Sequence, residues 1–337
     1  MDNLIRHVRD SHVLAKLVGN APAFLEAIKT LPAIARSDAS TLISGETGTG
    51  KELVARAIHY LSDRAPFPFV PVNCGSFPDS LLEDELFGHE RGAFTSAHIA
   101  RGGLIAHAGK GTLFLDEVDT LPHKAQVDLL RVLQDKRFRA IGSSMEQVAD
   151  VRIVAATNAP LERLVESGRF RADLYFRLRI FWIALPLLRD RQEDVLPLAE
   201  HFLRNHAPPQ RAHLRLAPEA CDALLSHDWP GNVRELENAI IRGIHLSETE
   251  WIQPADLGLQ PPPGPKAHAF PLDNLRPLGT MKREVIHSFE KEYLTRLMSR
   301  HGGNVSQAAR TAGKERRSLG RLLKKHNLES KMFRAAS

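Results

Sequence analysis

A short glycine-rich segment holds the residues best suited to binding phosphate. Residues 45–52 read GETGTGKE; they follow an apolar run and precede a stretch with helical spacing. In a G-x-x-x-x-G-K pattern the glycines let backbone N–H groups approach phosphate oxygens, and the lysine, here Lys51, reaches the β and γ phosphates. The position that often carries a magnesium-binding Ser or Thr holds Glu52. We therefore predict a nucleotide site formed by Gly45, Glu46, Thr47, Gly48, Thr49, Gly50, Lys51 and Glu52.

Two acids follow a second apolar run, in the sequence GTLFLDEVDTL. At the carboxyl edge of a parallel sheet, Asp116 would hold the magnesium ion of the nucleotide and Glu117 would polarise the attacking water. The alternative is that both acids cap the next helix. A third run, VAATN, ends in Asn158, which is predicted to sense the γ-phosphate unless it only makes a turn.

Arginines further along the chain are candidates for contact with the transferred phosphoryl group. The segment RFRADLYFRLRIF carries Arg171 and Arg177. An arginine supplied by a neighbouring subunit can stabilise charge on that group, so exposed arginines here suit an oligomer with sites between subunits. Taken singly, each is more simply explained by a surface ion pair. Arg234 lies just inside a helix whose start is marked by Pro230, Gly231 and Asn232, and it is predicted to reach the nucleotide from there.

These side chains need a sheet that brings them to one edge. Apolar runs at 40–45, 69–73, 112–116 and 151–158 alternate with helix-length segments, which predicts a doubly wound α/β fold with a parallel sheet flanked by helices. From residue 186 to about 258 the spacing becomes purely helical, and a proline-rich linker follows. We divide the chain into a short N-terminal segment (1–18), an α/β subdomain (19–188), a helical lid subdomain (189–258), a linker (259–279) and an all-α domain (280–337).

Composition excludes several classes of protein. The 337 residues are 43% hydrophobic and 25% charged, enough for two or three domains, and no run of about 18 apolar residues could span a bilayer. The first twenty residues lack the pattern of a signal peptide, so we expect a cytoplasmic protein without membrane contact. Cys74 and Cys221 lie far apart without a C-x-x-C pair, so we interpret both as packing residues.

The net charge of +5 is concentrated at the C-terminus. Residues 279–337 hold 14 Lys and Arg against 5 Asp and Glu, a net +9, so the remainder carries −4. This excess is either a solvated helical face or a nucleic-acid surface. Residues 302–328 contain two helical stretches joined at Gly313, which predicts a helix-turn-helix, and the helix before it, 281–301, has the pattern of a dimerisation element. The side chains expected on bases and phosphates are Arg316, Arg317, Ser318, Arg321, Lys324 and Lys325.

Taken together, the motifs resemble those of a known family. GETGTGKE, ELFGHERGAFTSA, GTLFLDEVD, ATN, FRADLYFRL and WPGNVRELEN have the order and spacing of the AAA+ ATPase domain of bacterial enhancer-binding proteins, the sigma-54-dependent activators. The resemblance covers about residues 18–258 and resumes in a Fis-type DNA-binding domain. It implies a P-loop NTPase fold, ATP and Mg²⁺ as cofactors, and Glu as the usual residue at position 52. It also implies that Asn73 restrains Glu117 until ATP is placed, and that Arg171 and Arg177 act in trans.

The resemblance gives a role to the GAFTSA segment. The family's GAFTGA loop contacts sigma-54 with its Phe and Thr, which correspond to Phe94 and Thr95. The implied activity is that of a ring, assembled from dimers to a hexamer, which remodels the sigma-54 RNA polymerase holoenzyme while the C-terminal domain holds upstream enhancer DNA. Only about eighteen residues precede the α/β subdomain, too few for a receiver domain. Control is therefore expected from abundance, a regulatory protein or a paralogous subunit.

Two other functions stay open at this point. Ser96 stands where the family has glycine, which favours a DNA-binding regulator, activator or repressor, whose ATPase drives oligomerisation without sigma-54 contact. For Phe94 itself, the alternative to sigma-54 contact is a local packing role. An AAA+ helicase or unfoldase is the third reading, but it does not explain a GAFTSA loop together with a terminal helix-turn-helix.

Overall fold

The computed structural model describes residues 17–95, 97–259, 301–326 and 328, together with separate positions between 279 and 298. These residues belong to two compact units, Met1–Pro262 and Pro263–Ser337, which are considered one at a time. Ser96, most of the predicted linker 259–279 and nearly all of the predicted segment 1–18 lie outside the described residues. Within the described part of the chain, no helix is both long and apolar enough to cross a membrane.

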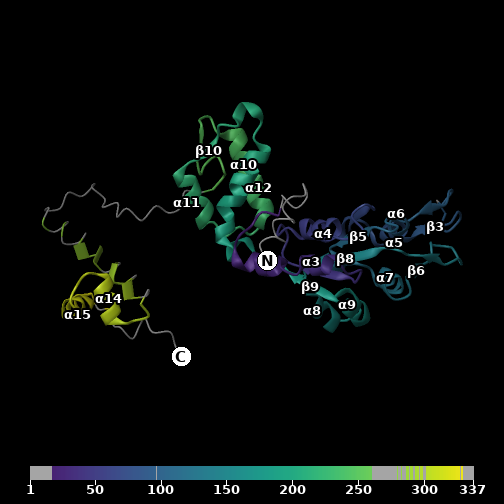
Figure 1. Cartoon of the computed structure of the whole chain (residues 1–337), viewed down its shortest axis with the longest axis horizontal. Helices are drawn as coiled ribbons and strands as arrows, with labels where there is room; N and C mark the ends of the chain where they lie inside the picture. The colour runs from purple at the N-terminus through teal and green to yellow at the C-terminus, as the bar shows by residue number, and fades with distance from the viewer. Residues whose placement is uncertain are drawn as a thin grey trace. The chain divides into compact units, whose positions relative to one another are not determined.

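A five-stranded sheet, parallel throughout, forms the centre of the first unit (Figure 1). Its order is β2 (Phe69–Asn73), β5 (Thr112–Asp116), β8 (Arg152–Thr157), β1 (Thr41–Ser44) and β9 (Phe181–Ala184). The four apolar runs of the sequence become β1, β2, β5 and β8, so the predicted parallel sheet is confirmed. The register pairs Asn73 with Asp116 and Ser44 with Thr157, and therefore aligns the carboxyl ends of four strands.

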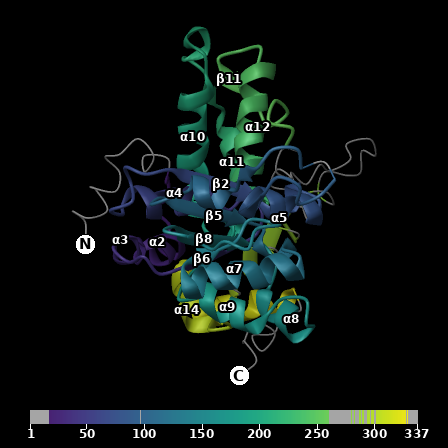
Figure 2. The ribbon, with the colours of Figure 1, turned by 90° about the vertical axis from the view of Figure 1, so that its right-hand side faces the viewer.

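Alternation along the strands builds a separate core on each face of the sheet. Ile43, Phe114 and Val154 point to one face. The helices there are α2 (Pro22–Ile28), α3 (Leu31–Ala35) and α4 (Lys51–Tyr60). Leu42, Leu113 and the other alternate residues point to the opposite face, under α5 (Asp79–Phe87), α6 (Leu104–His107), α7 (His123–Asp135), α8 (Leu161–Glu166) and α9 (Ala172–Leu178). Figure 2 shows α4 and α7 on opposite sides of β5 and β8.

Two small antiparallel hairpins extend from this unit. One pairs β3 (Gly88–His89) with β4 (Arg101–Gly102), and the other pairs β6 (Arg137–Phe138) with β7 (Gln147–Val148). They contact each other, since the N–H of Ile141 donates to the carbonyl of Gly88 and the N–H of Glu90 donates to the carbonyl of Ile141. The GAFTSA segment is the connection between β3 and β4, so its base is held by a second hairpin.

The segment after β9 forms the lid. It contains α10 (Val195–His206), α11 (Pro218–Ser226) and α12 (Asn232–Leu246), with α10 and α12 side by side (Figures 1 and 2). Short 3₁₀ turns lie at Leu188–Asp190, Gln192–Asp194 and Pro209–Arg211. The prediction of a purely helical segment is wrong in one detail, because β10 (Arg215–Leu216) pairs with β11 (Trp251–Ile252). Two residues are too few to show a period of two in the sequence.

The second unit contains the predicted helix-turn-helix. Asn304 caps α14 (Val305–Thr311) by accepting from the N–H groups of Ser306 and Gln307 at 3.1 and 3.3 Å. Gly313, at φ 60°, makes the turn before α15 (Arg316–Lys325). The buried side chains Ala308, Ala309, Leu319 and Leu323 share a core with Leu294, Leu297 and Met298 of the preceding segment, whose described positions are helical.

Candidate active site

The phosphate loop joins β1 to the N-terminus of α4. Gly48 and Gly50 have φ values of 80° and 103°, a region that side chains other than glycine rarely adopt. No side chain caps the start of α4, so the N–H groups of its first turn and its dipole are available to an anion. The buried ammonium of Lys51 donates to the carbonyls of Gly45 and Glu46 at 2.8 and 3.2 Å, so it lies inside the loop.

Acids from the neighbouring strand face this lysine. Burial lowers the pKa of Lys51, and the carboxylates of Asp116 and Glu117 oppose that effect. A carboxylate oxygen of Asp116 accepts from the N–H of Glu117 at 3.0 Å, and Glu117 itself adopts a left-handed conformation at φ 53° before the 3₁₀ turn Val118–Thr120. The acids therefore do not cap a following α-helix as the alternative reading had it. Carboxylate oxygens are ligands that Mg²⁺ prefers, so Asp116 and Glu117 suit that ion.

Asn73 and Glu117 meet at the same glycine. The side-chain oxygen of Asn73 accepts from the N–H of Gly75 at 2.8 Å and starts the 3₁₀ turn Cys74–Ser76. A Cβ added to Gly75 would overlap a carboxylate oxygen of Glu117. Gly75 thus leaves the space that the Glu117 carboxylate occupies, and the predicted restraint of Glu117 by Asn73 has a short structural path through this residue.

Asn158 lies at the end of the adjacent strand. Its side-chain nitrogen is 3.4 Å from the hydroxyl of Thr47 in the phosphate loop, a long hydrogen bond. The preceding Thr157 donates to Asp119 at 2.6 Å and ties the end of β8 to the 3₁₀ turn that follows β5. The structure therefore brings Lys51, Asp116, Glu117 and Asn158 to one edge of the sheet.

The lid is fastened to the phosphate loop by a residue whose role the sequence did not reveal. Asn232 is buried at φ 51°; its side-chain nitrogen donates to the carbonyl of Thr47 at 3.1 Å, and its side-chain oxygen accepts from the N–H of Leu188 at 2.9 Å. The N–H of Val233 also donates to the carbonyl of Gly48 at 3.0 Å. A Cβ on Gly48 would overlap the carbonyl of Gly231, so glycine is required there for docking as well as for phosphate access.

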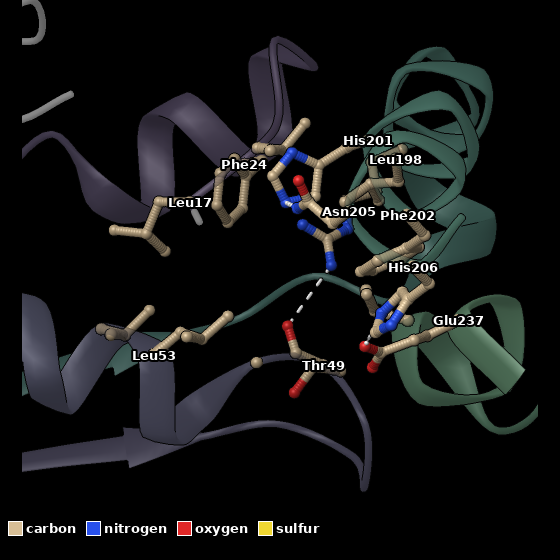
Figure 3. Close-up of a pocket in the computed structure, with 15 residues that line it drawn as sticks. Leu17, Phe24, Thr49, Leu53, Leu198, His201, Phe202, Asn205, His206 and Glu237 are labelled. Carbon is tan, nitrogen blue, oxygen red and sulfur yellow. Dashed lines mark hydrogen bonds and ion pairs between the residues drawn. The ribbon is translucent and has the colours of Figure 1, made fainter. Parts of the chain in front are cut away.

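A cavity of about 660 Å³ lies beside the phosphate loop, between α4, α2 with the residues just before it, and the lid (Figure 3). Leu17, Phe24 and Leu53 line one side, and His201 and Asn205 of α10 line the other. Its size and mixed polarity are typical of a small-molecule site.

A buried arginine forms part of the wall of this cavity. Arg191 donates to the carbonyl of Thr49 at 3.3 Å and stacks on the ring of Phe24 at 4.7 Å. Burial lowers the pKa of Arg191, an effect that nearby Asp194 opposes. Asp194 in turn accepts from the N–H groups of Asn20 and Ala21, at 2.5 and 2.9 Å. In the sequence, Arg191 has no distinguishing feature except its position before a helical segment. That position does not separate it from a surface arginine.

The other predicted ligands fall in different places. A Cβ added to Gly48 would lie 3.2 Å from the Cβ of Arg234. The charge of Arg234 also lowers the pKa of Lys51, although burial and the acids have larger effects. Arg234 is therefore close to the phosphate loop. Glu52 is turned away, because it pairs with Arg56 at 2.7 Å on the exposed side of α4. Its role as a nucleotide ligand remains a prediction.

The two candidate trans-acting arginines lie on and before α9. Arg171 pairs with Asp173 at 2.7 Å, which is the surface ion pair that the simpler reading expected. Arg177 is exposed, and its guanidinium makes no ion pair with any residue that the structure describes. The two arginines therefore differ in how free they are to contact another subunit.

At the tip of the β3–β4 connection, Phe94 is 41% exposed and its ring contacts His89 at 4.8 Å. Thr95 is exposed. Local packing thus accounts for part of the Phe94 surface and leaves the rest open. Ser96, on which the alternative function depends, is not among the described residues.

The predicted DNA-contacting residues lie on one helix. All six, from Arg316 to Lys325, are exposed on α15, while Leu319 and Leu323 face the core. Lys325 pairs with Glu290 at 2.8 Å, so it is tied to the preceding segment. The other basic side chains of the set are Arg316, Arg317, Arg321 and Lys324.

Comparison with known proteins agrees with this architecture. Residues 17–184 match the sigma-54 interaction domain, residues 189–265 match an AAA+ ATPase lid domain, and residues 286–326 match the Fis family of bacterial regulatory proteins. The regulatory protein AtoC of Escherichia coli strain K12 is 42% identical over 337 residues, which cover 98% of this chain and 72% of AtoC. The transcriptional regulatory protein ZraR of Klebsiella oxytoca is 43% identical over 304 residues, or 90% of this chain and 67% of ZraR.

Solved structures extend the comparison to nucleotide binding. NtrX from Brucella abortus in complex with ATP has 35% sequence identity and a TM-score of 0.65, covering 97% of this chain and 73% of NtrX. NtrX in complex with ADP matches with a TM-score of 0.66. The shared architecture and the phosphate loop described above identify this chain as a nucleotide-binding ATPase. The chain therefore belongs to the sigma-54-dependent transcriptional activators, AAA+ ATPases that combine a sigma-54 interaction domain and a lid with a Fis-type helix-turn-helix.

Proposed function

We propose that this activator hydrolyses ATP at the contacts between subunits of a ring and uses the Phe94 loop to remodel the sigma-54 RNA polymerase holoenzyme. The supporting observation is the common sheet edge at which the phosphate loop, the acid pair of β5 and Asn158 meet. A ring of six subunits, built from dimers, is the assembly that we propose.

Each residue at this edge has a distinct task in hydrolysis. Lys51 exchanges its two loop carbonyls for phosphate oxygens, where its charge is needed. Mg²⁺ held by Asp116 would neutralise charge on those oxygens. Glu117 orients and polarises the attacking water, and Asn158, beside Thr47, is placed to respond to the terminal phosphate. Arg234 approaches the same phosphates from the lid.

The cavity next to the phosphate loop suits the base and ribose of ATP. Phe24 and Leu53 offer apolar surface to a flat base, and α10 supplies polar side chains on the opposite wall. Arg191 and Asn232 join the lid to the carbonyls of Thr49 and Thr47, so ATP in this cavity would contact both parts of the unit at once.

We assign Arg171 and Arg177 to the nucleotide of a neighbouring subunit. Exposed apolar side chains surround them, namely Phe176, Ile180 and Trp182 on α9, the following turn and β9. β9 is also an edge strand of the sheet, with one side unpaired among the described strands. Exposed apolar surface next to arginines is typical of a protein interface. A second subunit on this side would bring the arginines to its phosphates.

The remaining assignments concern DNA and place of action. The six exposed polar residues of α15 would bind upstream enhancer DNA, with the arginines and Ser318 toward the bases and Lys324 and Lys325 toward phosphates. Since DNA and the polymerase are its partners, we propose that the protein acts in the bacterial cytoplasm. A regulatory protein or a paralogous subunit would then supply control.

The first experiment measures ATP-dependent open-complex formation at a sigma-54 promoter with purified components and upstream DNA. We expect opening with the native protein, none with Lys51→Ala because ATP is not hydrolysed, and none with Thr95→Ala although ATP is hydrolysed. Thr95→Ser is the matched control, since it keeps the hydroxyl. ATP hydrolysis by the native protein without any opening would refute the remodelling function and favour the regulator that does not contact sigma-54.

Mixing variants tests the action of the arginines in trans. Lys51→Ala subunits cannot use their own site but still present Arg177, and Arg177→Ala subunits keep a complete phosphate loop. A mixture is therefore expected to hydrolyse ATP faster than either variant alone. If the mixture shows only the sum of the two residual rates, Arg177 does not act on a neighbouring subunit.

A further inference from the structure

The base of the Phe94 loop is closed by a buried histidine. His89, at the end of β3, has its Nδ1 atom 2.5 Å from a carboxylate oxygen of Asp84 on α5. Its Nε2 atom is 2.9 Å from the carbonyl oxygen of Ile99, on the far side of the loop. The ring therefore connects α5, the strand that enters the loop and the loop residue Ile99 shortly before β4.

Both ring nitrogens of His89 face oxygen acceptors. A neutral imidazole carries one N–H, so it could donate to only one of the two oxygens. The arrangement holds when the ring carries both protons, or when the Asp84 carboxyl carries the proton between them. In either state the ring is held at both of its nitrogens, and a flip of the ring would break both hydrogen bonds.

Phe94 rests on this fixed ring. The centroids of the two rings are 4.8 Å apart with an angle of 60° between the planes, which is an edge-on contact of the favourable kind. With 41% of its surface exposed, Phe94 has His89 on one side and open space on another. The aromatic side chain at the loop tip thus has a defined resting position.

Backbone hydrogen bonds join the base of the loop to the second hairpin, whereas those at the tip join residues of the loop to one another. At the base, Glu90 and Gly88 bond to Ile141 of the second hairpin at 3.0 and 2.8 Å. At the tip, the N–H of Gly92 donates to the carbonyl of Ala97 at 2.8 Å, and the N–H of Ala97 donates to the carbonyl of Phe94 at 2.9 Å. The N–H of Ala93 also donates to the carbonyl of Glu90 at 3.1 Å, and Ala93 lies close to Gly142 of the second hairpin. For the side chain of Phe94, the contact with the ring of His89 connects it to the base.

We propose that His89 is a positioning residue that holds Phe94 on the base of the loop, and that Phe94 must leave this ring to contact sigma-54. The proposal rests on the function assigned above to Phe94. The loss of an edge-on aromatic pair changes an equilibrium by roughly two- to tenfold. Without the His89 ring, the loop should therefore occupy its released state about that much more often.

His89→Gln is the decisive variant. A glutamine can still donate from its amide nitrogen to the carbonyl of Ile99, so the loop base stays closed while the aromatic ring is lost. His89→Ala removes both the ring and the hydrogen bonds. Asp84→Asn is the matched control, because its amide can donate to Nδ1 of a neutral His89 whose Nε2–H still faces Ile99, and the ring stays in place.

Two readouts are measured on the full chain. Amide hydrogen exchange of residues 90–100 reports the loop without sigma-54, and binding of purified sigma-54 is compared without nucleotide and with ADP–aluminium fluoride, which mimics the transferred phosphoryl group. For His89→Gln we expect faster exchange and a two- to tenfold gain in binding without nucleotide, with ATP turnover within about twofold of native. Asp84→Asn should resemble the native protein in both readouts.

The outcomes distinguish a failure of this proposal from a failure of the function assigned to Phe94. If exchange of the loop in His89→Gln equals that of the native protein, His89 does not hold Phe94 and the proposal is overturned. Faster exchange without a gain in sigma-54 binding, while Phe94→Ala still abolishes binding in the ADP–aluminium fluoride state, also overturns it, since release would then not limit contact. If Phe94→Ala binds sigma-54 like the native protein, the function assigned to Phe94 fails, whatever the exchange of His89→Gln shows.

Discussion

Replacing Asn232 should detach the lid from the phosphate loop. Its side chain makes two buried hydrogen bonds, to the carbonyl of Thr47 at 3.1 Å and to the N–H of Leu188 at 2.9 Å. Leaving two such groups without partners costs about 2–3 kcal/mol of the free energy of unfolding. In Asn232→Ala the residue must also keep a φ of 51°, which costs an alanine about 1 kcal/mol more. We therefore expect a loss of about 3–4 kcal/mol.

Two further variants divide this loss into its parts. Asn232→Gly removes the same hydrogen bonds but accepts the positive φ, so it should be the more stable of the two by about 1 kcal/mol. Asn232→Asp keeps an oxygen for the N–H of Leu188 and places a second oxygen, in place of the donor, against the carbonyl of Thr47. It should retain part of the stability and lose the contact with the phosphate loop.

Urea unfolding, followed by tryptophan emission, measures the loss of stability in the part of the chain that contains the lid. Trp229 is buried near Asn232, whereas Trp182 and Trp251 are about half exposed, so the emission shift reports mainly the lid. A loss of this size moves the midpoint by about 1–2 M urea. The KM for ATP should rise about tenfold, as expected when about 1.4 kcal/mol of binding is lost. If Asn232→Gly unfolds at the native midpoint, the two hydrogen bonds do not hold the lid and the reasoning is wrong.

Other predictions address single residues. Gly48→Ala should raise the KM for ATP far more than Gly50→Ala. Both glycines have positive φ, but only at Gly48 would a Cβ overlap the carbonyl of Gly231. Steady-state kinetics measures both KM values, and equal increases would contradict the prediction. Burial raises the pKa of Cys74 to about 12, so at pH 8 its thiol should resist alkylation in the folded protein. Mass spectrometry should show that Cys221 reacts first. Fast labelling of Cys74 would argue against its burial. Gly320→Ala should stabilise α15 by about 1 kcal/mol, raising the thermal midpoint of the C-terminal unit, because a Cβ there meets open space.

The sheet was predictable because its signal is local. Each of the four predicted strands is a largely apolar run that ends in a polar residue or glycine. Such a run indicates burial on both faces, which β5 and β8 show, whereas β2 at the edge of the sheet is partly exposed. β9 escaped prediction, since Phe181–Ala184 directly follows the apolar spacing of α9 and reads as its continuation. The hairpins β3–β4 and β6–β7 contribute two residues per strand and leave no periodic signal.

The phosphate loop and the acid pair were predictable for a similar reason, because one motif or one strand end supplies each. Asn232 and Arg191 were not, since each acts on a residue more than a hundred positions away. The sequence around Asn232 indicates the start of a helix and says nothing of what that start contacts. An asparagine after a glycine at a helix start can adopt positive φ, which is the one signal that could have attracted attention.

One continuous segment connects the hydrolysis site to the loop that carries Phe94. It begins at Asn73 and Gly75, where the carboxylate of Glu117 occupies the space of a side chain, and passes directly into α5. That helix of nine residues is about 13 Å long, and on it Asp84 holds the ring of His89. Any movement of Glu117 toward a water molecule changes its contact with the start of this segment. Because α5 is short, we expect it to move as one piece, so a displacement at Gly75 would also shift Asp84 and the ring of His89 on which Phe94 rests.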